Sequence, residues 1–117
     1  MKNLEKAARK FLPLSEATYL ILASLTQPRH GYSIMQEVET VSGGRVRVGP
    51  GTLYGALTNL LKQKLIHRSG ETGAQTDRRK VYALTPLGEK VLVLEGERLT
   101  AMSKLASNVS KKLGGES

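Results

Sequence analysis

The segment from Gly49 to Leu84 constrains the fold of this chain more than any other. It runs GPGTLYGALTNLLKQKLI, then HRSGETGAQTDRRK, then VYAL, which predicts a helix, a strand, a polar turn and a returning strand. Pro50 suits the first helical position, because its ring presets φ and its missing N–H would be unpaired there anyway. A helix followed by such a hairpin predicts a mainly α fold with a small β-wing, a winged helix-turn-helix.

The predicted helix has two different sides when its residues are placed about 100° apart. One arc is apolar, with Tyr54 at its end: Ala56, Leu60, Leu53, Leu57, Leu61 and Tyr54. The other arc is small and polar and has no acidic residue, as a surface lying against phosphate requires: Thr58, Gly51, Lys62, Gly55, Asn59, Thr52 and Gln63. We expect this helix to enter the major groove, where Thr and Asn can reach base edges. The candidate DNA contacts on it are Thr52, Tyr54, Thr58, Asn59 and Lys62.

Basic residues flank this helix on both sides. The stretch RVRV before it alternates basic and apolar, so Val46 and Val48 are expected to point inward and the arginines outward. The wing is predicted as strands over residues 65–67 and 81–84 around a polar turn, and three cations precede the second strand. The expected phosphate contacts are Arg45, Arg47, Arg78, Arg79 and Lys80. The alternative is that these cations belong to an ordinary solvated turn and strand end.

Three motifs in this chain resemble the PadR family of bacterial transcriptional regulators. They are HGYSIMQEVE, GTLYGALTNLLKQKLI and RRKVYALTPLGEKVL, which together span roughly residues 30 to 92. Lys62 and Lys64 stand where the family commonly has Glu and Gly, and Val81-Tyr82 replaces its usual aromatic pair. The resemblance implies a DNA-binding regulator whose effector binds at the dimer interface, or between that interface and the winged domain. The residues that could line such a pocket are Phe11, Tyr19 and Met102, and the favoured alternative is that these three are packing residues.

The composition favours a nucleic-acid partner and argues against catalysis. Eighteen Lys and Arg residues against 10 Asp and Glu residues give a formal charge of +8, which suits an acidic polymer. No apolar run approaches the about 20 residues needed to span a membrane, and no signal-peptide core is present, so we expect a cytoplasmic protein. The chain has no cysteine, and His30 and His67 lie far apart, so we expect no metal, no cofactor and no enzymatic activity.

The segments before residue 45 are expected to support the wing and its helix. Residues 1–12 form a helical extension with a basic side, which either contacts a partner subunit or phosphate, or is a frayed terminus. Ser15 is a plausible N-cap for a buried scaffold helix. A positioning helix is expected over Gly31–Val41, with Glu37 and Glu39 facing away from phosphate. We divide the chain into the extension 1–12, a winged helix-turn-helix domain 13–85, and a dimerisation helix with its tail, 86–117.

The last helix is predicted to start with Thr85 as cap and Pro86 at its first position, and to reach Leu113. Gly88 and Gly96 are tolerable interruptions. One seam can pack on the winged domain: Leu87, Val91 and Leu94. A second, heptad-spaced seam needs another surface, and the simplest is the same helix of a second copy: Leu92, Leu99, Met102, Ala106, Val109 and Leu113. The alternative is a single helix lying along its own domain.

These features predict a sequence-specific, homodimeric transcriptional regulator. Our first hypothesis is a repressor on a palindromic operator, with half-sites about 34 Å apart, released by a small-molecule effector. We expect Arg79→Ala to weaken binding to all DNA sequences alike. The competing hypothesis is a winged-helix protein-interaction module that binds no DNA.

Overall fold

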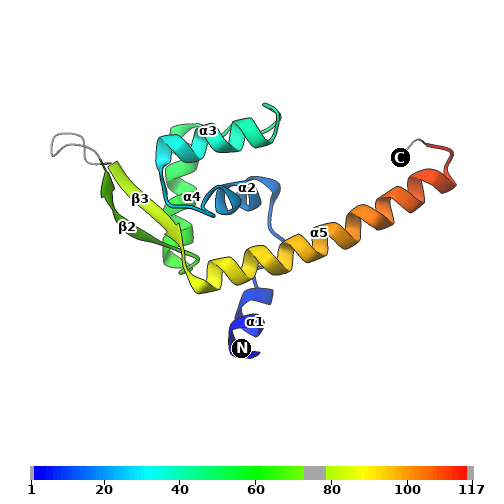
Figure 1. Cartoon of the computed structure of the whole chain (residues 1–117), viewed down its shortest axis with the longest axis horizontal. Coiled ribbons are helices and arrows are strands. Elements are labelled where there is room, and N and C mark those ends of the chain that lie inside the picture. Colours follow the sequence, from blue (N-terminus) through cyan, green and yellow to red (C-terminus); the bar gives the residue numbers. More distant parts are fainter. Residues whose placement is uncertain (1, 73–78, 116–117) are drawn as a thin grey trace.

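The computed structural model describes residues 2–72 and 79–115. Their elements, in chain order, are α1 (Lys2–Arg9), α2 (Glu16–Ser24), β1 (Arg29–His30), α3 (Gly31–Val41), α4 (Pro50–Lys62), β2 (Ile66–Thr72), β3 (Arg79–Leu84) and α5 (Pro86–Lys112). Figure 1 shows α2, α3, α4 and the β2–β3 hairpin gathered at one end, while α5 runs past them and projects far beyond. The predicted fold class, a winged helix-turn-helix with a long C-terminal helix, is confirmed.

The two sides of α4 separate as the periodicity predicts. Leu53, Leu57 and Leu60 are buried in the core, and every residue of the small polar arc is exposed. Tyr54 is the exception on the apolar arc, because 48% of its surface remains exposed. The core side therefore fixes the orientation of α4, and the acid-free side is left open to solvent.

The sheet contains more than the predicted hairpin. Its order is β1-β3-β2, all antiparallel, and the short strand β1 was not predicted. Strand β2 continues to Thr72, so the prediction that Ser69, Gly70 and Thr72 form a turn was wrong. The register shifts between Arg68 and Gly70, which is a bulge that lets the strand continue through turn-forming residues.

The helix starts follow the predicted caps. The Ser15 hydroxyl accepts a hydrogen bond from the Thr18 N–H over 3.1 Å, and the Thr85 hydroxyl accepts from the Gly88 N–H over 3.0 Å. Pro50 and Pro86 occupy the first positions of α4 and α5. These local signals explain why the predicted starts of α2, α4 and α5 agree with the structure.

Helix α1 packs on the chain's own α5, below it in Figure 1. Ala8 is completely buried there, and Lys90 Nζ of α5 lies 3.9 Å from Glu5 Oε1. The alternative of a frayed terminus was therefore wrong. Because its apolar side faces α5, α1 widens the support under the N-terminal half of that helix.

Helix α5 has one apolar arc with two different surroundings. Gly88, Val91, Leu94 and Glu95 are buried, whereas the apolar residues beyond Gly96 are exposed. At about 100° per residue, Val91 and Val109 point in the same direction, so the two predicted seams merge into one stripe. The rest of the chain covers only the first part of this stripe, and the remainder of the stripe extends beyond it. Within residues 2–72 and 79–115, no helix is long and apolar enough to cross a membrane.

Candidate nucleic-acid interface

The open face of α4 is the first part of the candidate interface. Thr52, Asn59 and Lys62 are exposed on it. The Thr58 hydroxyl donates to the Tyr54 carbonyl over 2.9 Å, which leaves its oxygen able to accept from a base. The helix begins after Gly49, whose position provides no side-chain cap, so the N–H groups of the first turn remain available to a phosphate.

Tyr54 joins α4 to the start of α3. Its hydroxyl lies over Gly31, the first residue of α3, in the space that a Cβ at position 31 would occupy. The ring is therefore held at the junction of the two helices and is half exposed. This places the exposed part of Tyr54 beside the open face of α4, while its hydroxyl packs against Gly31.

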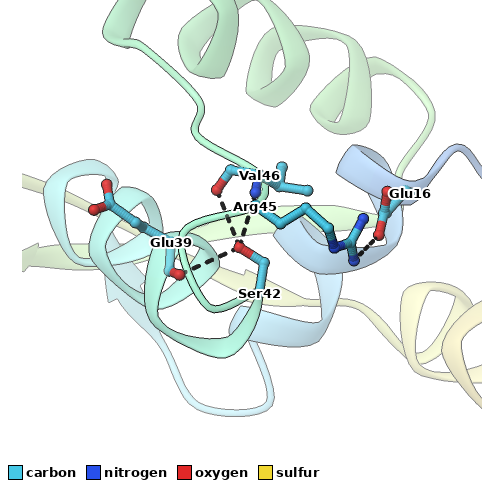
Figure 2. Close-up of polar contacts among 5 residues, drawn as sticks. All are labelled: Glu16, Glu39, Ser42, Arg45 and Val46. Carbon is cyan, nitrogen blue, oxygen red and sulfur yellow. Dashed lines mark hydrogen bonds and ion pairs between the residues drawn. The ribbon is translucent and has the colours of Figure 1, made fainter.

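The loop between α3 and α4, residues 42–49, carries the two predicted arginines. Val48 is buried and both Arg45 and Arg47 are exposed, as the alternation predicts. In Figure 2 the Arg45 guanidinium reaches Glu16 at the start of α2, and the two form an ion pair. Arg47 Nε lies 3.8 Å from Glu39 Oε2 of α3. The hydrogen bond from Arg45 is the main cause that lowers the pKa of Glu16, so this carboxylate stays charged.

The wing contributes further cations. Lys80 is exposed on β3, and Arg79 is the first residue of that strand. Arg78 lies outside the described residues. Arg68 is exposed on β2 and was not among the predicted DNA contacts. Its position directly after the predicted strand 65–67 could have pointed to it. It faces Tyr82 across the ladder, where burial raises the pKa of Tyr82 and the positive charge of Arg68 partly opposes that rise.

Lys64 has a structural role that its charge did not reveal. Its φ is 61°, the left-handed conformation that usually takes glycine. The Leu65 N–H donates to the Leu60 carbonyl and the Lys64 N–H to the Leu61 carbonyl, each over 3.1 Å. These two bonds are the Schellman arrangement that ends a helix. Where the family commonly has Gly, this chain therefore has a lysine in a backbone conformation that favours glycine.

The predicted effector residues do not meet. Phe11 lines a cavity of about 230 Å³ between the α1–α2 linker and α4, with Asn59 and Gln63 on its other side. Tyr19 lines a different cavity of about 430 Å³, against Leu99 of α5. Met102 lies further along α5 and is half exposed. Among the residues that the structure describes, no three His, Asp or Glu side chains gather as a metal site.

The predicted dimer residues lie mostly in the free part of α5. Those with the largest exposed side chains are Leu99, Met102, Val109 and Leu113. Ala106 is exposed beside them, and Leu105, which the heptad count missed, is 57% exposed at the edge of the same stripe. Leu92 differs, because it is half buried and packs against the core of its own chain.

Comparison with known proteins gives the family that the sequence motifs resemble, and the match covers most of the chain. Residues 20–93 match the transcriptional regulator PadR-like family. A curated relative, an uncharacterized 37.1 kDa protein in transposon TN4556 of Streptomyces fradiae, is 38% identical over 90 residues. That alignment covers 76% of this chain but only 24% of the relative, so the chain spans about a quarter of its length.

Solved structures share the fold over 80–86% of the chain. The protein smu.1704 from Streptococcus mutans is 30% identical with a TM-score of 0.65, covering 80% of this chain and 86% of that one. A PadR family transcription regulator from Clostridium difficile is 23% identical with a TM-score of 0.68, covering 86% of this chain and 100% of that one.

Proposed function

The chain belongs to the PadR-like family of transcriptional regulators, and from this premise we propose that it represses transcription as a homodimer on a palindromic DNA site. The observation that carries the proposal is the open face of α4. It is exposed along its length, has no acidic residue, and in the chain it follows the arginines of the preceding loop and precedes the cations of the wing. Thr52, Thr58 and Asn59 would read bases, and the flanking cations would hold phosphates.

The second half of the proposal is dimerisation through α5. The stripe from Leu99 to Leu113 leaves its own domain and exposes large apolar side chains on one side of the helix. A stripe of this kind on a projecting helix is stable in water when it packs on a matching stripe, and a second copy supplies one by two-fold symmetry. We therefore propose residues 13–85 as the DNA-binding unit and residues 86–117 as the dimerisation unit.

A two-fold dimer would present two α4 helices to one DNA duplex. Half-sites one helical turn apart, about 34 Å, would suit such a pair. An effector that binds near Tyr19 and Leu99, between α2 and α5, would change the spacing of the two helices and so the affinity for the site. The proposed role places the protein with the chromosome in the cytoplasm.

The test is binding of the purified protein to DNA from its own upstream region, titrated with salt and competed with unrelated duplex. Tight binding that survives competition, at two chains per site, is the expected result. Binding that unrelated DNA removes equally would replace the regulator by a general DNA-coating protein. An absence of binding at low salt would favour the alternative, in which the α5 stripe docks on another protein.

A further inference from the structure

Two cations that the proposed function assigns to DNA are already occupied in the free chain. Arg45 and Arg47 precede α4, and each faces a carboxylate from a different helix. Glu16 stands at the first position of α2, and Glu39 lies in α3. A carboxylate presents oxygens to a guanidinium much as a phosphate does. A guanidinium that holds a carboxylate must release it, wholly or in part, before it can hold a phosphate in the same way.

The loop does not need these ion pairs to keep its shape. Figure 2 shows Ser42 at its centre, where the hydroxyl oxygen accepts from the Val46 N–H over 3.0 Å. The Gly44 N–H donates to the Glu39 carbonyl over 2.8 Å, and Val48 is buried in the core. Backbone bonds and apolar burial therefore hold residues 42–48 in place.

The side chains of the two pairs are free to separate. The side chains of Arg45 and Glu16 are 65% and 52% exposed, and those of Arg47 and Glu39 are 74% and 53% exposed. Ion pairs this exposed contribute little to folding, because water solvates the separated charges well. The pairs can open without disturbing the core, which is what a reversible exchange with phosphate requires.

We propose that Glu16 and Glu39 compete with DNA phosphate for Arg45 and Arg47, and so limit the affinity of this protein for DNA. This inference rests on the proposed function. In the free protein the carboxylates hold the two guanidinium groups, and on the duplex the arginines transfer to backbone phosphates. The two carboxylates then keep binding weak enough to be reversed. Removing either one should strengthen DNA binding rather than weaken it.

The experiment is a double-mutant cycle on Glu16 and Arg45, with a DNA duplex of about 30 base pairs, roughly three helical turns, as the probe. Glu16→Gln is expected to lower Kd by about two- to fivefold, the range for one exposed ion pair. Arg45→Gln should raise Kd and reduce the slope of log K against log salt by about one, whereas Glu16→Gln should leave that slope unchanged. In the Arg45→Gln background, Glu16→Gln should have no effect.

A control separates this exchange from the general repulsion between acidic residues and DNA. Glu97→Gln removes one exposed carboxylate from α5 and should change Kd much less than Glu16→Gln does. The Glu39 and Arg47 cycle should repeat the pattern with a smaller gain, because that pair is longer.

Four results would overturn the inference. Weaker DNA binding by Glu16→Gln together with a lower Tm would give Glu16 a structural role. An equal gain in the presence and absence of Arg45 would reduce its effect to long-range charge. If the wild type binds DNA and the variants bind with the same Kd, the competition is rejected but the proposed function stands. If the wild type binds no duplex at low salt, the proposed function is rejected as well.

Discussion

Gly88 lies directly against the backbone carbonyl of Leu65, so closely that a Cβ at position 88 would overlap the Leu65 oxygen. This contact joins the first turn of α5 to the residue that links α4 and β2. The Thr85 N–H donates to the same carbonyl over 3.1 Å, so the start of α5 is fixed to the end of α4 through backbone atoms. Helices α5 and α4 are therefore rigidly connected at this point.

Gly88→Ala should destabilise the protein by about 1–3 kcal/mol, because the added methyl group must push α5 away from Leu65. Gly96→Ala is the matched control in the same helix. There a Cβ would meet only the Tyr19 hydroxyl, at 3.9 Å, so alanine should stabilise the helix by about 0.5–1 kcal/mol. Urea unfolding of both variants measures the difference. If both substitutions were stabilising, the close contact at Gly88 would be wrong.

Glu95 should make the stability of the protein depend on acid pH. It is buried in α5, accepts from the Leu14 N–H over 2.8 Å and pairs with Arg98 over 2.6 Å. The hydrogen bond from Arg98 lowers the pKa of Glu95 below its ordinary value of 4.5, although burial opposes this. Its folded pKa is thus below its unfolded pKa. The contribution is complete above the unfolded pKa and is lost as pH falls through the folded pKa.

The measurement is urea unfolding of the wild type and of Glu95→Gln across that acidic range. Glutamine keeps an acceptor for Leu14 but cannot titrate, so the difference between the two proteins should shrink as the solution becomes more acidic. Glu95→Ala leaves the Leu14 N–H unpaired and should cost about 1–3 kcal/mol near neutral pH. A difference between wild type and Glu95→Gln that does not change with pH would contradict the assigned pKa direction.

Lys64→Gly should stabilise the protein by about 1 kcal/mol, because glycine adopts the left-handed conformation at little cost. Lys64→Ala is the control, since it removes the same charge but keeps a Cβ in that conformation. Thermal unfolding should rank glycine above lysine and alanine. Any change in DNA affinity caused by the lost charge should be equal in both variants. A stabilisation of the same size in Lys64→Ala would assign the effect to charge instead.

Asn59 and Arg79 should affect DNA binding differently. Asn59→Ala, on the open face of α4, should relax base preference at one position of the operator, at a cost of about 1–3 kcal/mol. Arg79→Ala, at the start of β3, should weaken binding to every sequence alike and reduce the salt slope by about one. Selection of bound sequences from a random duplex pool, with each variant, measures both effects. A change of base preference in Arg79→Ala would overturn its assignment to phosphate.

Met102→Glu should separate the proposed dimer into single chains. Met102 lies in the middle of the exposed stripe of α5, so an acidic residue there would be buried without a partner when two copies pack together. Asn108→Glu adds the same charge on another side of the helix and is the control. Light scattering should give twice the chain mass of 12.7 kDa for wild type and control, and a single-chain mass for Met102→Glu. A Met102→Glu protein that stayed dimeric would move the interface elsewhere.

Local patterns in the sequence were sufficient for the starts of α2, α4 and α5 and for the open face of α4. The caps at Ser15 and Thr85 and the two helix-starting prolines act on neighbouring residues, so each helix start could be inferred without knowing the fold. The strand β1 could not, because two residues gain strand character only from pairing with β3. The bulge after Arg68 likewise exists only relative to its partner strand.

The sequence by itself determined which side of each helix is apolar, where α2, α4 and α5 begin, and that the chain is basic. Only the tertiary structure decided what those features contact. It showed that a Cβ has room at Gly96 but not at Gly88, although both look alike in a helical sequence. It also made Glu95, a charged residue among the apolar positions of α5, the hydrogen-bond partner of Leu14, a residue 81 positions away. The physical reason is range: periodicity and capping depend on residues a few positions apart, whereas close approach and burial depend on how distant segments pack.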